Sequence, residues 1–95
     1  MNRLTAEEAS AGVAQLDGWR VKDDTIMRRI KTRDFAEALR IANLAGEVAE
    51  QRNHHPEIRL GWGFCRITFT THDAGGLTQA DLDAAAAVDE ALAGG

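Results

Sequence analysis

Residues 34–52, in the middle of the chain, constrain the fold most strongly, because their apolar side chains recur at three- and four-residue spacing. That spacing is typical of an amphipathic helix, and Asp34 is its predicted N-cap. Pro56 disfavours helical backbone at the preceding residue, so the helix ends before it. The apolar residues form two stripes, one of Phe35, Ala38, Leu39, Ala42, Ala45 and Ala49 and another of Ile41, Leu44 and Val48. We therefore expect this helix to contact two neighbours, a sheet and a second subunit.

Pairs of strand-like segments precede and follow this helix. Residues 19–22 and 25–31 form the first pair around a turn of two aspartates, and residues 57–62 and 64–71 form the second, with Gly61 and Gly63 at a bend or bulge. Segment 64–71 is rich in aromatic and β-branched side chains and alternates as a half-buried strand does. Its apolar face holds Cys65, Ile67, Phe69 and Thr71, and its more polar face holds Phe64, Arg66, Thr68, Thr70 and His72.

Capping signals predict a helix at each end of the chain. Thr5 and Glu8 form a capping box before a helix that extends to about residue 16, and Thr78 and Asp81 repeat that spacing before a final helix. Residues 73–76 are a predicted loop. The order helix, strand, strand, helix, strand, strand, helix predicts an α+β fold, with helices packed on one face of a four-stranded antiparallel sheet. Residues 1–95 form a single domain, since a second would be too small to fold alone.

Size and charge narrow the classes of partner. A domain of this size buries only about 60–65% of the surface of its unfolded chain, so self-association would help to stabilise it. The net charge of −4 argues against the concentrated basic face that nucleic acid requires, and we expect no nucleic-acid partner. One basic cluster is interpreted as a solvated face, with contact to an anion or a partner as the alternative; it consists of Arg28, Arg29, Lys31 and Arg33.

Cys65 is the only cysteine, which excludes an intrachain disulfide and a CxxC metal site. In an apolar strand it is interpreted as a small buried hydrophobe. The N-terminus lacks the basic-then-apolar profile of a signal peptide, and no segment approaches the roughly 20 apolar residues of a membrane span. We therefore expect a cytoplasmic location and no membrane contact.

All three histidines lie in two short segments. His54 and His55 are adjacent and followed by Pro56, and His72 closes the threonine-rich strand 17 residues after His55. Imidazole has an ordinary pKa of about 6.5, so it can both donate and accept a proton near neutrality. Glu50, on the last turn of the long helix, can accept from an imidazole N–H and hold its charged form in place. The pattern favours proton-transfer chemistry or ligand recognition at one shared site.

Two alternatives remain open on spacing alone. A histidine near a helix C-terminus is favoured by the helix dipole and need have no other role. A metal site is the second alternative, although adjacent histidines do not readily bind one ion and the set would be strained. Trp19 and Trp62 are interpreted as core or interface residues, with stacking on a planar ligand as the alternative for Trp62.

The histidine segments, taken together, resemble the pterin-4a-carbinolamine dehydratase family. The similarity rests on Glu50 with residues 54–57, His-His-Pro-Glu, and on residues 70–78, Thr-Thr-His-Asp-Ala-Gly-Gly-Leu-Thr. It extends over nearly the whole chain, including the opening at residues 4–8, the Gly18-Trp19 pair and Asp34-Phe35 at the start of the long helix. Animal members often have an acid where this chain has Asn53, and an aromatic where it has Ile58.

The resemblance implies a hydro-lyase that removes water from a 4a-hydroxytetrahydropterin, giving the quinonoid dihydropterin during recycling of tetrahydrobiopterin, with no metal and no other cofactor. By the family pattern the catalytic set is His54, His55, His72 and Glu50, with His55 and His72 as the main acid/base pair and His54 orienting the ligand. The implied substrate-binding set consists of the three histidines with Asn53, Thr70, Thr71 and Asp73. The resemblance also implies a homodimer or homotetramer formed through the helices. A non-catalytic dimerisation or assembly cofactor with the same fold is the competing interpretation.

Overall fold

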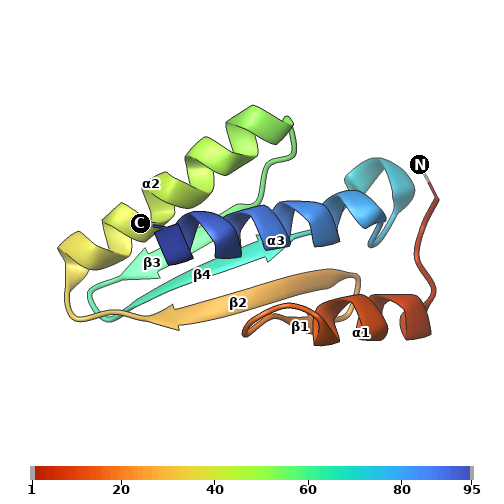
Figure 1. The fold of residues 1–95 in the computed structure, drawn as a ribbon, viewed down its shortest axis with the longest axis horizontal. Helices are drawn as coiled ribbons and strands as arrows, with labels where there is room; N and C mark the ends of the chain where they lie inside the picture. Colours follow the sequence, from red (N-terminus) through yellow and green to blue (C-terminus); the bar gives the residue numbers. More distant parts are fainter. Residues whose placement is uncertain (1, 95) are drawn as a thin grey trace.

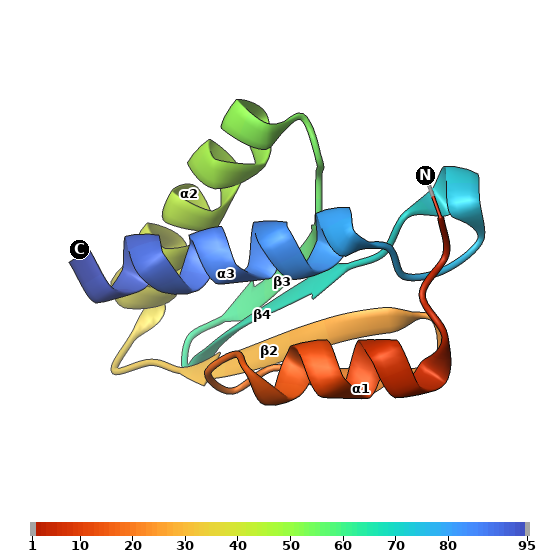
Figure 2. The same cartoon turned by 45° about the vertical axis from the view of Figure 1, so that its right-hand side comes forward.

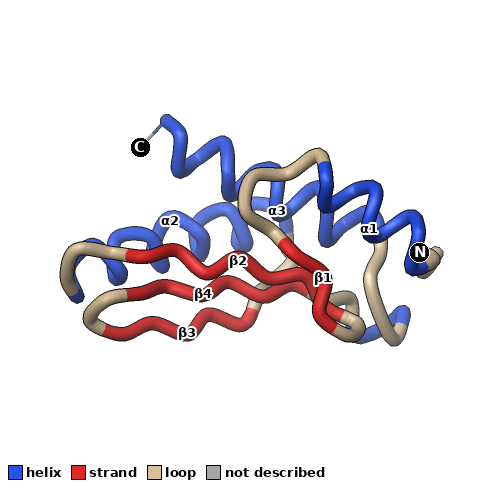
Figure 3. Tube along the Cα trace, turned by 90° about the horizontal axis from the view of Figure 1, so that it is seen from below, coloured by secondary structure: helices blue, strands red, loops and turns tan. Residues whose placement is uncertain are grey.

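Three helices cover one face of a four-stranded antiparallel sheet, as the element order predicted (Figures 1 and 3). The computed structural model describes residues 2–94. The strands are β1 (Arg20–Lys22), β2 (Thr25–Lys31), β3 (Glu57–Gly61) and β4 (Phe64–Phe69), arranged in the order β1-β2-β4-β3. The helices are α1 (Ala6–Ala14), α2 (Phe35–Arg52) and α3 (Gln79–Gly94), and η1 (His72–Ala74) is a single 3₁₀ turn. β3 and β4 pair as a hairpin, so β3 begins where β4 ends.

The core lies between the sheet and the helices. β2 and β4 contribute fully buried side chains from alternate positions, including Ile26, Ile67 and Phe69, and α3 covers them with Ala84, Ala85 and Val88. Burying a side chain of the size of Phe69 stabilises the fold by about 1.5–3 kcal/mol. Small alanines on α3 let its backbone approach the sheet closely.

The long helix buries one face drawn from both predicted stripes. Its buried residues are Ala38, Ile41, Ala45, Val48 and Ala49. Phe35 and Leu39, which the sequence assigned to the first stripe, remain 50% and 45% exposed. Because an α-helix turns 100° per residue, the two stripes together are wider than the face that one sheet can cover. The residues of the stripes that lie farthest from the sheet therefore remain exposed to solvent. The Asp34 side chain accepts from the Glu37 N–H at 2.9 Å, which confirms the predicted N-cap.

Four sequence-based expectations need correction. β4 ends at Phe69, and Thr71 instead makes an isolated bridge with Gly76. The predicted loop at 73–76 begins inside a 3₁₀ turn, because the Gly75 N–H donates back to the His72 carbonyl at 3.0 Å. Trp62 is 70% exposed at the β3–β4 turn and is not a core residue.

The predicted basic cluster is also split by the pleat of β2. Arg28 points to the helices and donates to the Asp89 carboxylate at 2.6 Å, so it is not part of a solvated face. Asp89 accepts in addition from the Trp19 indole N–H at 2.7 Å, and Trp19 is buried as predicted. Arg29 and Lys31 lie on the other face of the sheet, which no helix covers within residues 2–94.

Candidate active site

The two histidine segments meet at the end of the sheet where β3 begins and β4 ends (Figure 2). A cavity of about 260 Å³ lies between them, close to the lower limit of roughly 300–1,000 Å³ that small-molecule sites occupy. Its lining consists of Asn53, His54, His55, Thr70, Thr71, His72 and Asp73. These are the seven residues that the family resemblance implied for substrate binding. The structure therefore brings all three imidazoles to one cavity.

A left-handed residue at the end of α2 sets the direction of the histidine pair. Asn53 has φ 50° and ψ 43°, a conformation that asparagine tolerates better than most residues. The His54 N–H then donates to the Ala49 carbonyl at 3.1 Å, which closes the helix. The chain leaves the helix in an extended conformation before Pro56, so the side chains of His54 and His55 point in different directions.

His54 is the most firmly held of the three imidazoles. Its Nε2 lies 2.6 Å from Oδ1 of Asp81, and its ring stacks on Phe69 with 5.7 Å between centroids and 8° between planes. The His54 side chain is 18% exposed, and that of Asp81 is fully buried. This contact fixes the orientation of the ring and leaves Nδ1 as the nitrogen that can donate or accept a proton elsewhere.

The Asp81 carboxylate is itself fixed by two further donors. Its Oδ2 accepts from the Thr78 backbone N–H at 2.9 Å and from the Thr71 hydroxyl at 2.8 Å. A buried carboxylate is costly unless such donors satisfy it. Since Thr78 N–H is a free donor at the start of α3, Asp81 caps that helix and holds His54 with the same side chain.

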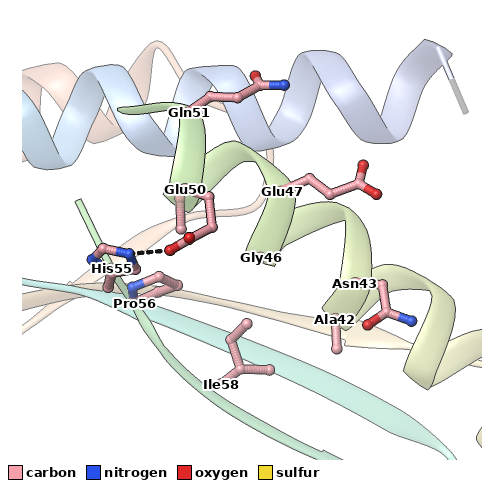
Figure 4. A pocket seen from close by; sticks show the side chains of 10 residues that line it. Ala42, Asn43, Gly46, Glu47, Glu50, Gln51, His55, Pro56 and Ile58 are labelled. Atoms are coloured by element: carbon pink, nitrogen blue, oxygen red, sulfur yellow. Dashed lines mark hydrogen bonds and ion pairs between the residues drawn. The ribbon is translucent and has the colours of Figure 1, made fainter. Parts of the chain in front are cut away.

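His55 pairs with Glu50 on the last turn of α2, with 2.5 Å between Nε2 and Oε2 (Figure 4). Both side chains are largely exposed, so the pair orients the ring without contributing much to stability. Figure 4 shows this pair among the residues that line a second cavity, between α2 and β3. This cavity has a volume of about 720 Å³, and its lining combines small or apolar residues such as Ala42 and Ile58 with polar ones such as Glu47. His55 thus borders both cavities.

The opposite wall of the smaller cavity comes from the end of β4 and η1. His72 and Asp73 are exposed on η1, and the Thr70 hydroxyl donates to the Asp24 carbonyl at 2.6 Å, which anchors this wall to the β1–β2 turn. Gly75 ends η1 with φ 71°, a conformation that favours glycine. Cys65 is buried at the other end of β4, where desolvation raises the pKa of its thiol, so it is not a candidate nucleophile.

Comparison with known proteins agrees with this geometry. The model of the pterin 4 alpha carbinolamine dehydratase family matches residues 2–91. The chain belongs to that family. Two relatives that carry its name provisionally are similar over most of their length. The one from Paracoccus denitrificans is 43% identical over 93% of this chain and 84% of its own, and the one from Rubrobacter xylanophilus is 47% identical over 90% and 81%.

A solved relative shows the same fold. The crystal structure of a protein from Brucella melitensis named transcriptional coactivator/pterin dehydratase superposes with a TM-score of 0.86 at 33% identity, covering 95% of this chain and 98% of that one. The pterin carbinolamine dehydratases are hydro-lyases, and this chain is an enzyme of that family.

Asp81 is the site residue that the sequence did not reveal as one. At the third position of the last helix it was explained fully by capping, and no spacing links it to His54, 27 residues earlier. The available signal was an acid three residues after Thr78, the last residue of the threonine-histidine segment. Within residues 2–94, no group of three or more His, Cys, Asp and Glu side chains is arranged to hold a metal ion, and no helix is long and apolar enough to cross a membrane.

Proposed function

We propose that this enzyme removes water from a 4a-hydroxytetrahydropterin, giving the quinonoid dihydropterin, by proton transfer through its histidines. In this reaction the C4a–O bond breaks, a proton joins the departing hydroxyl to form water, and a ring nitrogen loses a proton as the new double bond forms. The observation that carries the proposal is the convergence of His54, His55 and His72 on one cavity. Imidazoles with different surroundings can divide the two proton transfers, each of which contributes roughly 10²–10⁴-fold.

The division of roles follows from the surroundings of each ring. His55 and His72 are exposed at the cavity, where substrate and water can reach them, which suits the acid/base roles that the family pattern assigns to them. His54 is buried against Phe69 and held by Asp81, which suits an orienting role. A carboxylate in that position also stabilises an imidazolium, so we propose that His54 takes part in proton transfer as well.

The remaining polar groups of the cavity suit the amide-like edge of a pterin. Asn53 offers both a carbonyl and an NH₂ group, and the segment from Thr70 to Asp73 offers backbone groups beside its side chains. Asp73 and Thr71 stand on the wall opposite to Asn53. A flat ring between these walls would be contacted from both sides, which is how a small site fixes orientation with few polar groups.

The test is dehydration of an authentic 4a-hydroxytetrahydropterin, measured by stopped-flow absorbance for His54→Ala, His55→Ala and His72→Ala. At least two of the three variants should lose 10²–10⁴-fold in kcat, about the contribution of a positioned acid or base. Asn43→Ala is the matched control, because Asn43 is exposed on α2 and does not line the histidine cavity. Full turnover in both His55→Ala and His72→Ala would show that the catalytic assignment is wrong.

We further propose that the enzyme acts in the cytoplasm on tetrahydrobiopterin that an aromatic amino acid hydroxylase has oxidised. Its reaction would return the 4a-hydroxy product of such a hydroxylase to the redox cycle. A coupled assay with phenylalanine hydroxylase should show faster cofactor turnover on adding this protein and no change on adding the His72→Ala variant.

Self-association through α2 is part of the same proposal. Phe35 and Leu39 are half exposed on this helix, and a Cβ added at Gly46 would meet no atom within 4 Å, so a second helix can approach closely there. We expect a homodimer or homotetramer by sedimentation velocity. Leu39→Asp should lower the mass toward that of the 10.3 kDa monomer, and Arg40→Asp, at the exposed neighbouring position, should not. An unchanged mass in Leu39→Asp would exclude this face.

A non-catalytic role is the second candidate, favoured by one observation: the Brucella melitensis relative is named both coactivator and pterin dehydratase. A protein with only the coactivator role has no use for three ordered imidazoles. The variants above separate the two roles, because an assembly cofactor would lose nothing measurable on removal of His72.

A further inference from the structure

Three arginines stand side by side on the face of the sheet that the helices leave uncovered. The strand register pairs Arg29 of β2 with Arg66 of β4, and Arg66 with Arg59 of β3. Their neighbours along β4, Cys65 and Ile67, point to the core, so the arginines point to the opposite face. Adjacent strands are about 4.8 Å apart, which makes this a short transverse row of guanidinium groups. We call these three residues the arginine row.

The surrounding face is basic although the chain is acidic. By the same register and alternation Arg20, Lys22 and Lys31 share the face of the arginine row, and Glu57 is its one acid. Six of the 11 Lys and Arg side chains therefore lie there, against one of the 15 Asp and Glu side chains. The rest of the molecule carries the negative charge, so the two sides differ in sign.

Within residues 2–94, no ion pair neutralises the three arginines of the row. Arg3, Arg28 and Arg33 each have a carboxylate partner in that part of the chain, but no ion pair involves the arginine row. The Arg29 guanidinium lies 4.7 Å from the centre of the Phe64 ring, which holds it flat on the sheet. Like charges directly opposite on neighbouring strands are destabilising. Folding therefore gives no reason for the row.

We propose that this face is a docking surface for an acidic α-helix of a partner protein, lying across the strands. Carboxylates four residues apart on a helix are about 5–6 Å apart, close to the spacing of the strands. Carboxylates on one side of an extended peptide are about 6.8 Å apart, which differs more from the spacing of about 4.8 Å between the arginines. Each guanidinium can donate two parallel N–H bonds to the two oxygens of one carboxylate.

Two other occupants fit less well. A nucleic acid extends beyond the row and would meet the acidic remainder of the molecule, which repels a polyanion within about a Debye length of 8–10 Å. A second copy of the chain lacks the required helix, because none of α1, α2 and α3 carries three acids at successive four-residue intervals. The proposal is independent of the dehydratase reaction, since the arginine row lies outside the histidine cavity.

The test is fluorescence anisotropy with a labelled alanine-rich helical peptide that carries glutamates at positions i, i+4 and i+8. A peptide of the same composition with its glutamates distributed around the helix is the comparator. The striped peptide should bind more tightly, and added salt should weaken it. Arg59→Gln and Arg66→Gln should each raise Kd about two- to fivefold, as for exposed ion pairs, and the triple Gln variant should abolish saturable binding. Arg40→Gln, an exposed site on α2, should change nothing.

Stability measurements separate docking from a structural role. Relief of like-charge contact should leave the urea midpoint of Arg66→Gln unchanged or higher, whereas a structural arginine would lower it. The proposal is overturned if neither peptide binds, if the two bind equally, or if Arg40→Gln weakens binding as much as Arg66→Gln. It is also overturned if a 12-nucleotide single-stranded RNA binds more tightly than the striped peptide and loses affinity in the same variants.

Discussion

The substitution Asp81→Asn tests the link between folding and chemistry most directly. Asparagine keeps the shape of aspartate but replaces one acceptor oxygen by an NH₂ donor and removes the charge. The wild-type carboxylate contacts His54 through Oδ1 and accepts from Thr78 N–H and the Thr71 hydroxyl through Oδ2. In one orientation of the amide, its NH₂ group faces His54. In the other orientation it faces the Thr78 N–H and the Thr71 hydroxyl, which need an acceptor.

The expected loss of stability follows from those contacts. Asp81 is fully buried, so a broken hydrogen bond is not replaced by water. Hydrogen bonds to charged groups contribute about 1.5–3 kcal/mol, so loss of one should lower the free energy of unfolding by about 2–3 kcal/mol. For a domain of this size that corresponds to a decrease in Tm of roughly 8–24 °C. The variant should remain folded at 25 °C if the wild type has an ordinary stability of about 5–15 kcal/mol.

We expect kcat to decrease by more than the decrease in the folded fraction of the enzyme would explain. Without the carboxylate His54 loses its orientation, and an imidazolium at that position loses its counter-charge. We expect kcat to fall about 10²-fold or more with little change in KM, because the polar walls of the cavity stay in place. Both quantities should be measured below the unfolding transition, with circular dichroism to give the folded fraction.

Asp83→Asn is the control for this experiment. Asp83 lies two residues further along α3, where its exposed carboxylate accepts from Gln79 Nε2 at 2.9 Å. Its substitution should change stability by less than about 0.5 kcal/mol and leave kcat unchanged. A folded Asp81→Asn enzyme with kcat within threefold of the wild type would refute the reasoning, because His54 would then act without its carboxylate.

Three further outcomes are expected. Glu50→Gln should lower kcat less than tenfold in the stopped-flow assay, since its pair with His55 is exposed and weakly held. Asp89→Asn should lower the free energy of unfolding by about 2–3 kcal/mol in urea titrations, because the half-buried Arg28 loses its counter-charge and an NH₂ group replaces one of two oxygens that both accept hydrogen bonds. Cys65 should react slowly with a disulfide reagent in the native state and quickly in 6 M urea; because burial raises the pKa of its thiol, the protonated form is favoured on folding, and stability should fall as the pH rises above 9.0.

Periodicity predicted the fold because each element buries one face. Alternation in segment 64–71 assigned Cys65, Ile67 and Phe69 to the core, and the structure confirms all three as fully buried. The end of that strand was wrong, since Thr71 continues the alternation but its N–H bonds to Gly76 instead of to a neighbouring strand. The end of a strand depends on which backbone groups find hydrogen-bond partners in the tertiary fold. The alternation of side chains does not predict those partners.

The clustering of the candidate site residues could be predicted only where they are contiguous in sequence. Asn53, His54 and His55 come together because they are adjacent, and the second wall follows from the hairpin. The partner of His54 depends instead on where α3 crosses the sheet, which no local pattern specifies. The charge of Arg28 illustrates the same limit: four basic residues suggested one solvated cluster, and only the pleat of β2 shows that Arg28 turns inward to Asp89.

The left-handed backbone at Asn53 limits how substrate preference can change over evolution. This residue borders the cavity and also reverses the chain at the end of α2. Only glycine, asparagine and aspartate adopt that conformation at small energetic cost. Natural variation at this part of the wall is therefore confined to a few short side chains, so a preference for a bulkier pterin would have to be acquired from η1, across the cavity.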